Sequence, residues 1–178
     1  MPSRSKPRYL ADAKVDGALD AKIRALLATC FVKPQDAVFQ TQRYFREPYP
    51  HRWIVADETG AFIAHVGAHE KTVRAAGKTY RIAGIAEVCV HPDHRGQGLV
   101  RTMLRQAHRG LARSGFDFAV LFGDPKVYAS SGYACVGNLF HDENIAGRIR
   151  RKNVAAMVHP LGKTPWPRGR VHLPGPTF

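Results

Sequence analysis

The residues with the clearest chemical pattern lie between Val88 and Leu104, where a strand-like segment, a loop and a helix follow one another. The loop contains two glycines, Gly96 and Gly98, which have no Cβ and let the main chain approach a ligand closely. An amphipathic helix begins directly after them, so unpaired backbone N–H groups meet the positive end of the helix dipole. This arrangement predicts a site for a phosphate group.

Two common nucleotide-binding motifs do not describe this loop. The chain lacks the G-x-x-x-x-G-K-[ST] pattern, and it has no G-x-G-x-x-G followed by an acidic residue about twenty positions later. The loop reads Arg95-Gly-Gln-Gly-Leu-Val100 and follows Val90-His-Pro92. It resembles the pyrophosphate loop, Arg/Gln-x-x-Gly-x-Gly/Ala, of the GCN5-related N-acetyltransferases (GNAT family). Val100 replaces the family's Gly or Ala, but a side chain on the core face of the helix leaves the backbone N–H in place.

A second segment, Tyr128-Ala-Ser-Ser-Gly-Tyr133, lies farther along the chain. It resembles the Tyr-x-x-x-Gly-aromatic segment of GNAT proteins and follows the loop in the family's order. The resemblance covers about residues 61–137 and extends to small bacterial GNAT proteins of unassigned acceptor. It implies an α/β GNAT-like fold: a mixed, mostly antiparallel twisted sheet with helices on both faces. A central pair of strands, the one ending near Val90 and the one over Phe116–Phe122, would splay to admit pantetheine.

The resemblance also implies a reaction, in which acetyl-CoA is the co-substrate and an acetyl group passes directly to a primary amine in a ternary complex. Such a transfer needs an anchored donor, a polarised carbonyl, a neutral amine and an acid for the leaving thiolate. The implied donor-binding residues are Val88, Cys89 and Val90 on the strand, and Arg95, Gly96, Gln97, Gly98, Leu99, Val100 and Arg101 in the loop and at the start of the helix.

Two side chains are candidates for the proton transfers. In relatives the tyrosine of the second segment lies close to the thioester sulfur, so the resemblance implies Tyr128 as the general acid. Glu87, on the strand that leads into the loop, would receive the proton of the amine directly or through water. The alternatives are that Tyr128 is a packing aromatic residue, that Glu87 is an exposed or ion-paired carboxylate, and that solvent serves as the base.

The sequence predicts no metal site. His91 and His94 flank a Pro-Asp pair, but without cysteines or an H-E-x-x-H helix this is a poor zinc signature. His65 and His69 on one strand would be about 13 Å apart, too far to share an ion. The chain has three cysteines and no C-x-x-C pair, which favours free buried thiols in a reducing cytosol over disulfides. These cysteines are Cys30, Cys89 and Cys135.

Hydrophobic periodicity predicts the elements that must position these residues. Two helices come first, an antiparallel meander of strands follows, and then helices and strands alternate. The predicted helices are 16–29, 34–45, 97–114 and 125–131, and the predicted strands are 53–55, 61–73, 80–90, 116–122, 133–136 and 155–159. One domain over residues 1–178 accounts for this order, with a flexible basic tail at residues 1–8.

Net charge leaves two other functions open. The 178 residues include 27 Lys+Arg and 14 Asp+Glu, a formal charge of +13 that attracts anions. Part of it lies on one helix face, at Arg101, Arg105, Arg109 and Arg113, and part in the cluster Arg148-Ile-Arg-Arg-Lys152. The alternatives are an N-acyltransferase that uses an acyl-carrier protein and a non-catalytic, nucleic-acid-associated protein with the GNAT fold.

The remaining expectations concern partners and location. The sequence has no apolar run long enough for a secretory signal or a membrane span. It therefore predicts a cytoplasmic protein without a membrane partner. The sequence contains no recognisable DNA- or RNA-binding motif, which disfavours nucleic acid as a partner. The expected partners are acetyl-CoA and a small-molecule or peptide amine, and a homodimer is left open.

Overall fold

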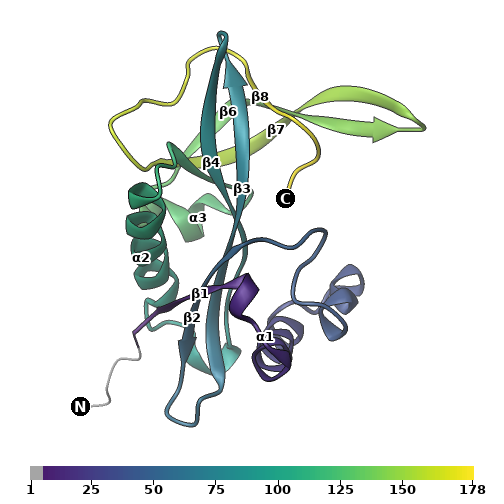
Figure 1. Ribbon diagram of the computed structural model, residues 1–178. Helices are drawn as coiled ribbons and strands as arrows, with labels where there is room; N and C mark the ends of the chain where they lie inside the picture. The colour runs from purple at the N-terminus through teal and green to yellow at the C-terminus, as the bar shows by residue number, and fades with distance from the viewer. Residues whose placement is uncertain (1–5) are drawn as a thin grey trace. The chain divides into compact units, whose positions relative to one another are not determined.

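The computed structural model describes residues 6–178 and divides the chain into two compact units. Within the described residues, unit 1 consists of 6–69 and Ile85–Ala107, and unit 2 consists of Glu70–Gly84 and His108–Phe178. Strands β3 (Phe62–Ala75) and β4 (Lys78–Val90) and helix α2 (Leu99–Arg113), which are labelled in Figure 1, contribute residues to both units. None of the helices in residues 6–178 combines the length and apolar character needed to span a bilayer.

Unit 1 combines one complete α-helix and three 3-10 helices with strands. Its first strand β1 pairs antiparallel with β2, and β2 pairs antiparallel with β3, whose neighbour is β4. Its elements, apart from the parts of β3, β4 and α2, are β1 (Arg8–Ala11), η1 (Asp12–Lys14), α1 (Gly17–Cys30), η2 (Pro34–Gln40), β2 (His51–Ala56) and η3 (Pro92–His94).

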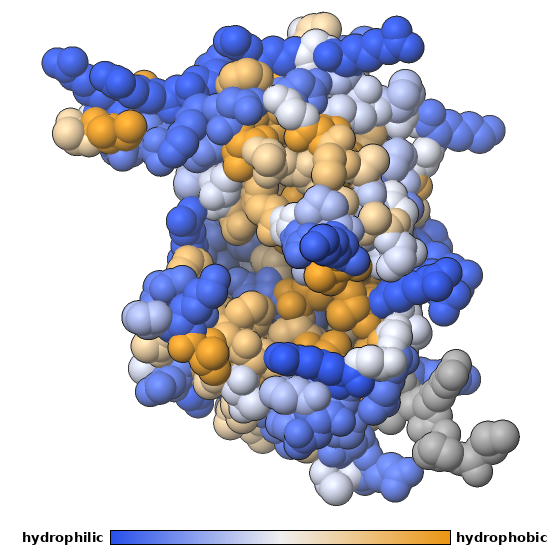
Figure 2. All heavy atoms as spheres, turned by 180° about the vertical axis from the view of Figure 1, so that it is seen from behind, coloured by the Kyte–Doolittle hydropathy of each residue, from blue (hydrophilic) through white to orange (hydrophobic). Residues whose placement is uncertain are grey.

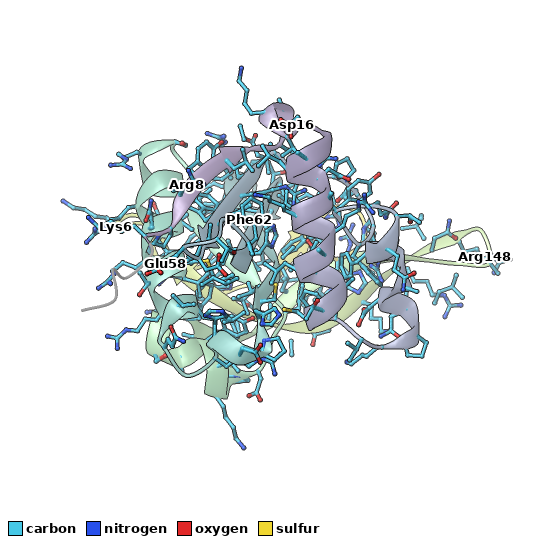
Figure 3. All side chains as sticks on the ribbon, turned by 90° about the horizontal axis from the view of Figure 1, so that it is seen from below. Lys6, Arg8, Asp16, Glu58, Phe62 and Arg148 are labelled. Atoms are coloured by element: carbon cyan, nitrogen blue, oxygen red, sulfur yellow. The ribbon has the colours of Figure 1, made fainter. Side chains whose placement is uncertain are left out.

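Helix α1 begins where the sequence predicts it. Asp16 is the N-cap, and its carboxylate accepts a 2.8 Å hydrogen bond from the Leu19 N–H (Asp16 is labelled in Figure 3). The helix buries Ile23, Leu26 and Leu27 in an apolar cluster that also contains Phe39, Ile54, Phe62 and Cys89. This cluster fixes α1 and η2 against the strands of unit 1.

Unit 2 contains the mixed part of the sheet. Its strands follow the order β4-β5-β7-β6-β8, with β4 parallel to β5 and β6 parallel to β8. The β4–β5 ladder joins Ile82–Gly84 to Phe118–Val120. The elements are β5 (Phe118–Leu121), α3 (Pro125–Tyr128), η4 (Ala129–Ser131), β6 (Ala134–Ile145), β7 (Arg148–Pro160) and β8 (Val171–Leu173). Its core includes Ile82, Phe118, Val120, Leu139 and Val158, with Trp166 packed against it.

The β6–β7 hairpin is much longer than the strands predicted at 133–136 and 155–159. It turns through Ala146 and Gly147, both with positive φ (51° and 80°), as a two-residue hairpin turn requires. The outer half of the hairpin contains the basic cluster. Charged residues on both strands replace the alternation of apolar and polar residues from which a strand is predicted. The end of this hairpin is mostly hydrophilic with a small apolar group (Figure 2), which agrees with exposed Ile145 and Ile149; Arg148 is labelled there in Figure 3.

Most other predicted elements are confirmed, with ends that differ by a few residues. Gly115 follows α2 with φ of 78°, the left-handed conformation expected after a helix. The prediction of a helix over 34–45 is wrong, because the 3-10 helix η2 ends at Gln40 and an irregular segment follows it. The predicted tail at 1–8 lies mostly in residues 1–5, outside the described residues, and Arg8 already pairs with Ile54 in β1.

A buried ion-pair network ties Asp12, the residue directly after β1, to β2. The Arg52 side chain is fully buried, and its Nε donates to Asp12 Oδ1 at 2.9 Å. Arg43 binds the same carboxylate through Nε and Nη2, both at 2.8 Å. Burial alone would raise the pKa of Asp12, but hydrogen bonds from Arg43 and Arg52 lower it below its ordinary value.

Removing the shared carboxylate should be costly. We expect Asp12→Ala to lower the free energy of unfolding by about 3 kcal/mol, because it leaves the buried Arg52 charge uncompensated. Chemical denaturation measures this loss. The control is Glu143→Ala, which removes an exposed 3.3 Å ion pair to Lys152 and should cost less than about 1 kcal/mol. Equal losses in the two variants would contradict the structural role of Asp12.

Candidate active site

The loop before α2 presents a run of unused backbone donors. Within residues 6–178, the first backbone hydrogen bond into the helix runs from the Thr102 N–H to the Gly98 carbonyl at 3.1 Å. The N–H groups from Gly96 through Arg101 donate no backbone bond inside the described chain. They therefore lie at the positive end of the α2 dipole, free to bind an anion.

Both loop glycines adopt backbone conformations that other residues avoid. Gly96 has φ of 76° and Gly98 has φ of 72°, and a Cβ built on either residue would meet open space. Glycine is therefore required here by the backbone conformation, and the space above the loop stays open to a ligand.

Two arginines flank these donors. Arg95 Nε donates to the carbonyl of Val90 at 3.3 Å, which ties the loop to the end of β4. Arg101 is exposed in the first turn of α2, and that turn contains no acidic residue. Val100 is half-buried, in agreement with a side chain that turns toward the core while its N–H remains available.

Glu87 interrupts β4 just before this loop. Its φ is 43°, a left-handed conformation that costs a non-glycine residue about 1–3 kcal/mol. The ring of His65, on β3, hydrogen-bonds through Nδ1 to the Glu87 carbonyl at 2.7 Å. This bond helps to stabilise the strained backbone.

The partners of His65 define its protonation. Nδ1 faces a carbonyl, which can only accept, and Nε2 lies 3.0 Å from Nη1 of Arg52, which can only donate. The ring is therefore neutral with its proton on Nδ1. Burial, followed by the charge of Arg52, lowers the pKa of His65 to about 3, in agreement with this tautomer.

The same arginine also positions Tyr49. Its Nη1 donates to the Tyr49 hydroxyl at 2.9 Å, and its guanidinium lies 4.2 Å from the centroid of the tyrosine ring. The Tyr49 hydroxyl in turn hydrogen-bonds the Glu87 side chain. Arg52, Tyr49 and His65 thus hold both the side chain and the carbonyl of Glu87, and we call these three residues the Glu87 support.

The Glu87 carboxyl lies in an environment suited to proton transfer. Among residues 6–178, its buried Oε2 has no hydrogen-bond partner, although the carboxyl also accepts from the backbone N–H of Phe45. Burial raises the pKa of Glu87 above its ordinary value, and the bonds from Tyr49 and Phe45 and the charge of Arg52 only partly oppose that effect. A carboxylate with a raised pKa is a better proton acceptor.

Tyr128, the candidate acid, belongs to unit 2. It ends α3, whose first turn is capped by Asp124, and its ring lies 6.1 Å from that of Tyr133 in an edge-to-face contact. A Cβ on Gly123 would overlap the Tyr128 ring, so glycine is needed there for close approach. Tyr133 is buried, and its hydroxyl lies 2.8 Å from Nε2 of His108.

The structure thus brings part of the predicted site together. Unit 1 holds Glu87, the end of β4 at Val88, Cys89 and Val90, and the whole loop from Arg95 to Arg101. Tyr128 and its aromatic neighbours form a separate cluster in unit 2. The Glu87 support escaped sequence analysis, because its members stand on different segments and only strand pairing brings them to one place.

Three histidines of unit 1 have partners on the described part of the chain. The rings of His91 and His94 lie edge to face at 5.9 Å, and His65 is saturated by Arg52 and the Glu87 carbonyl. Nowhere in residues 6–178 do three His, Cys, Asp or Glu side chains gather as a metal site would need.

The model of the acetyltransferase (GNAT) domain matches residues 7–136. The chain belongs to the GNAT family. That match covers β1 through the start of β6, including the loop and Tyr128. The fold is accordingly the α/β GNAT fold with a mixed sheet, as the sequence predicts.

Curated relatives match this GNAT chain over a shorter stretch. N-acetyltransferase Eis of Mycobacterium tuberculosis is 35% identical over 81 residues, which are 45% of this chain and 20% of Eis. Uncharacterized N-acetyltransferase YhbS of Escherichia coli is 29% identical over 80 residues, 45% of this chain and 47% of YhbS. These sequence matches therefore span a fifth of Eis and about half of YhbS.

Solved structures of GNAT proteins share the fold over nearly the whole chain. E. coli YhbS in complex with CoA superposes with a TM-score of 0.65 at 22% identity, covering 97% of this chain and 92% of YhbS. A GNAT acetyltransferase from Brucella melitensis in complex with acetyl-CoA superposes with a TM-score of 0.59 at 15% identity, covering 94% and 96%.

Gly67 offers a test of the Glu87 support. A Cβ at this position on β3 would overlap the Tyr49 ring, so we expect Gly67→Ala to displace Tyr49 and destabilise the protein by about 1–3 kcal/mol. Denaturant melts measure the change. Gly137→Ala is the control, since a Cβ there meets nothing within 4 Å and should change stability by less than about 1 kcal/mol. A Gly67→Ala protein as stable as the control would show that Tyr49 is not held as described.

Proposed function

We propose that this GNAT chain is an acetyl-CoA-dependent N-acetyltransferase that transfers an acetyl group directly to a primary amine. The observation that carries the proposal is the run of free N–H groups from Gly96 to Arg101, inside the segment that matches the family. The complexes of YhbS with CoA and of the Brucella protein with acetyl-CoA support a CoA thioester as the donor.

In this proposal the loop binds the pyrophosphate of the donor. The backbone N–H groups of Gly96, Gln97, Gly98, Leu99, Val100 and Arg101 supply the hydrogen bonds. The guanidinium groups of Arg95 and Arg101 add charge-assisted contacts. The end of β4, at Val88, Cys89 and Val90, offers backbone groups to pantetheine and to the thioester carbonyl.

Proton transfer is assigned to the two predicted side chains. Glu87 accepts the proton of the ammonium acceptor, directly or through water, which leaves the neutral amine as the nucleophile. The amine attacks the thioester carbonyl, the C–N bond forms and the C–S bond breaks. Tyr128 donates its phenolic proton to the departing thiolate, and solvent restores that proton.

The acceptor belongs to the class of small-molecule or peptide amines. Direct transfer requires donor and acceptor to be bound together, so the proposal predicts a ternary complex instead of an acetyl-enzyme. In unit 1 the Oε2 of Glu87, which is buried and has no hydrogen-bond partner among residues 6–178, is the oxygen that we assign to accept the proton of the amine.

The donor site can be tested with a pair of matched glycine variants. Gly98 and Gly77 have φ of 72° and 74°, and a Cβ on either meets nothing within 4 Å. Alanine imposes the same backbone strain at both positions, but only Gly98 lies in the proposed cradle. We expect Gly98→Ala to weaken acetyl-CoA binding by at least about tenfold, or about 1.4 kcal/mol, in calorimetric titration.

The Gly77→Ala control should bind acetyl-CoA like the wild type. Loss of binding in both variants would point to general destabilisation and would remove the support for the cradle. A folded wild type that binds no acetyl-CoA would overturn the proposed function.

The role of Glu87 is tested by pH dependence. Because the base must be ionised, wild-type kcat/KM should fall as the pH drops through the Glu87 pKa, above the ordinary value for a glutamate. Glu87→Gln should lower kcat by about 10²–10⁴-fold and flatten this acidic limb. Tyr128→Phe, in contrast, should lower kcat and leave the acidic limb in place. An unchanged acidic limb in Glu87→Gln would assign the base to another group or to water.

A further inference from the structure

An aromatic side chain from the segment after β8 covers the last pair of the β4–β5 ladder in unit 2. The ladder ends at Gly84 and Val120, whereas β4 continues to Val90. A Cβ built on Gly84 would lie 2.8 Å from three atoms of the Phe178 ring, so this ring rests directly on the strand backbone. The centroid of the Phe178 ring also lies 5.0 Å from that of Phe122. Both rings are half-buried and keep part of their surface exposed.

Hydrogen bonds to β6 hold the segment that carries Phe178. The backbone N–H of Asp142 donates to the Gly175 carbonyl at 2.9 Å, and the Gly175 N–H donates to Asp142 Oδ2 at 3.1 Å. The Asp142 carboxylate also lies 2.9 Å from Nε2 of His172 on β8. Phe178 follows the last of these anchors closely, so the fold limits where its ring can lie.

The rings of Phe178 and Tyr128 lie on opposite faces of the end of β5. Val120 belongs to the apolar cluster against which Phe178 packs. Because successive side chains of a strand point to opposite faces, Leu121 faces away from this cluster. A Cβ on Gly123 would meet both Leu121 and the Tyr128 ring, so these two side chains share one face. The candidate acid therefore occupies one face and Phe178 the other.

We propose that the Phe178 and Phe122 rings form an aromatic wall for the acceptor, and that the protein favours amines with an aromatic or bulky apolar group. The inference rests on the proposed function, in which Tyr128 protonates the leaving thiolate. Since this acid occupies one face of the strand end, the amine has to approach the thioester from the other face, where Phe178 lies. Its apolar group then packs on the wall as its nitrogen attacks.

The chemistry of the wall sets the kind of discrimination it can provide. Phenylalanine side chains have no charge and no hydrogen-bonding group, so they select an amine by its apolar surface. Packing a phenyl ring against them removes apolar surface from water, which is worth about tenfold in specificity. Ligand sites are commonly lined by such aromatic side chains.

The experiment uses two amines that differ by one phenyl ring, 2-phenylethylamine and ethylamine, with saturating acetyl-CoA and the full chain. The amine preference is the ratio of their kcat/KM values, and comparing this ratio between variants cancels the different basicities of the amines. We expect Phe178→Ala to lower the preference by about tenfold, mainly through the KM for 2-phenylethylamine. Gly84→Ala should lower it in the same direction, because the new Cβ displaces the Phe178 ring without removing it.

Tyr80→Ala is the matched control. Tyr80 packs against the same apolar cluster, with its ring 5.8 Å from that of Phe118. It precedes Gly84 by four residues on β4, so it shares the face of Gly84 but lies away from the end of the ladder. We expect its loss to change the amine preference by less than about twofold. An equal drop in Tyr80→Ala and Phe178→Ala would assign the effect to lost core packing and overturn the wall.

A binding measurement separates the wall from the proposed function. Saturation-transfer difference NMR detects contact of the phenyl protons of 2-phenylethylamine with the protein without any acetyl transfer. The signal should weaken in Phe178→Ala and persist in Tyr80→Ala. No signal with the wild type, an equal signal in Phe178→Ala, or an amine preference that Phe178→Ala leaves unchanged or raises would overturn the wall. A wild type that binds no acetyl-CoA would overturn the proposed function, and the NMR signal would still decide whether the rings bind the amine.

Discussion

The fully buried guanidinium of Arg52 is the constraint on which unit 1 depends. A buried charge costs several kcal/mol unless charged and polar partners surround it, and the partners come from three other segments. Asp12 follows β1, Tyr49 precedes β2, and His65 lies on β3. Pairing this one buried charge therefore fixes the relative positions of those segments, and two of the partners, Tyr49 and His65, also hold Glu87.

The strain at Glu87 is understandable in this context. A glutamate with φ of 43° is stable only where neighbouring groups over-determine its conformation. Here a neutral histidine binds its carbonyl and a tyrosine binds its carboxyl. Among residues 6–178, the Oε2 of this carboxyl has no hydrogen-bond partner. The strained backbone conformation therefore occurs at Glu87, the residue assigned to proton transfer.

The loop and α2 were predictable because their signals are local. Glycines with positive φ, a flanking arginine and a 3.6-residue apolar period all lie within one short segment. The Glu87 support arises from strand pairing between distant segments, which no spacing in the sequence encodes. The outer half of the β6–β7 hairpin was missed because Arg150, Arg151 and Lys152 face solvent on both sides of the strand. The roles of Glu87 and Tyr128 stay predictions.

The placement of the two tryptophans has a spectroscopic consequence. The chain contains only two: Trp53 is buried on β2 in unit 1, and Trp166 packs on Phe118 in unit 2, with ring centroids 5.0 Å apart. Each unit therefore carries its own intrinsic fluorophore. Replacing one tryptophan by phenylalanine leaves an emission signal from the other unit alone. Whether the two signals change at the same denaturant concentration reports directly on whether the units unfold as one cooperative domain.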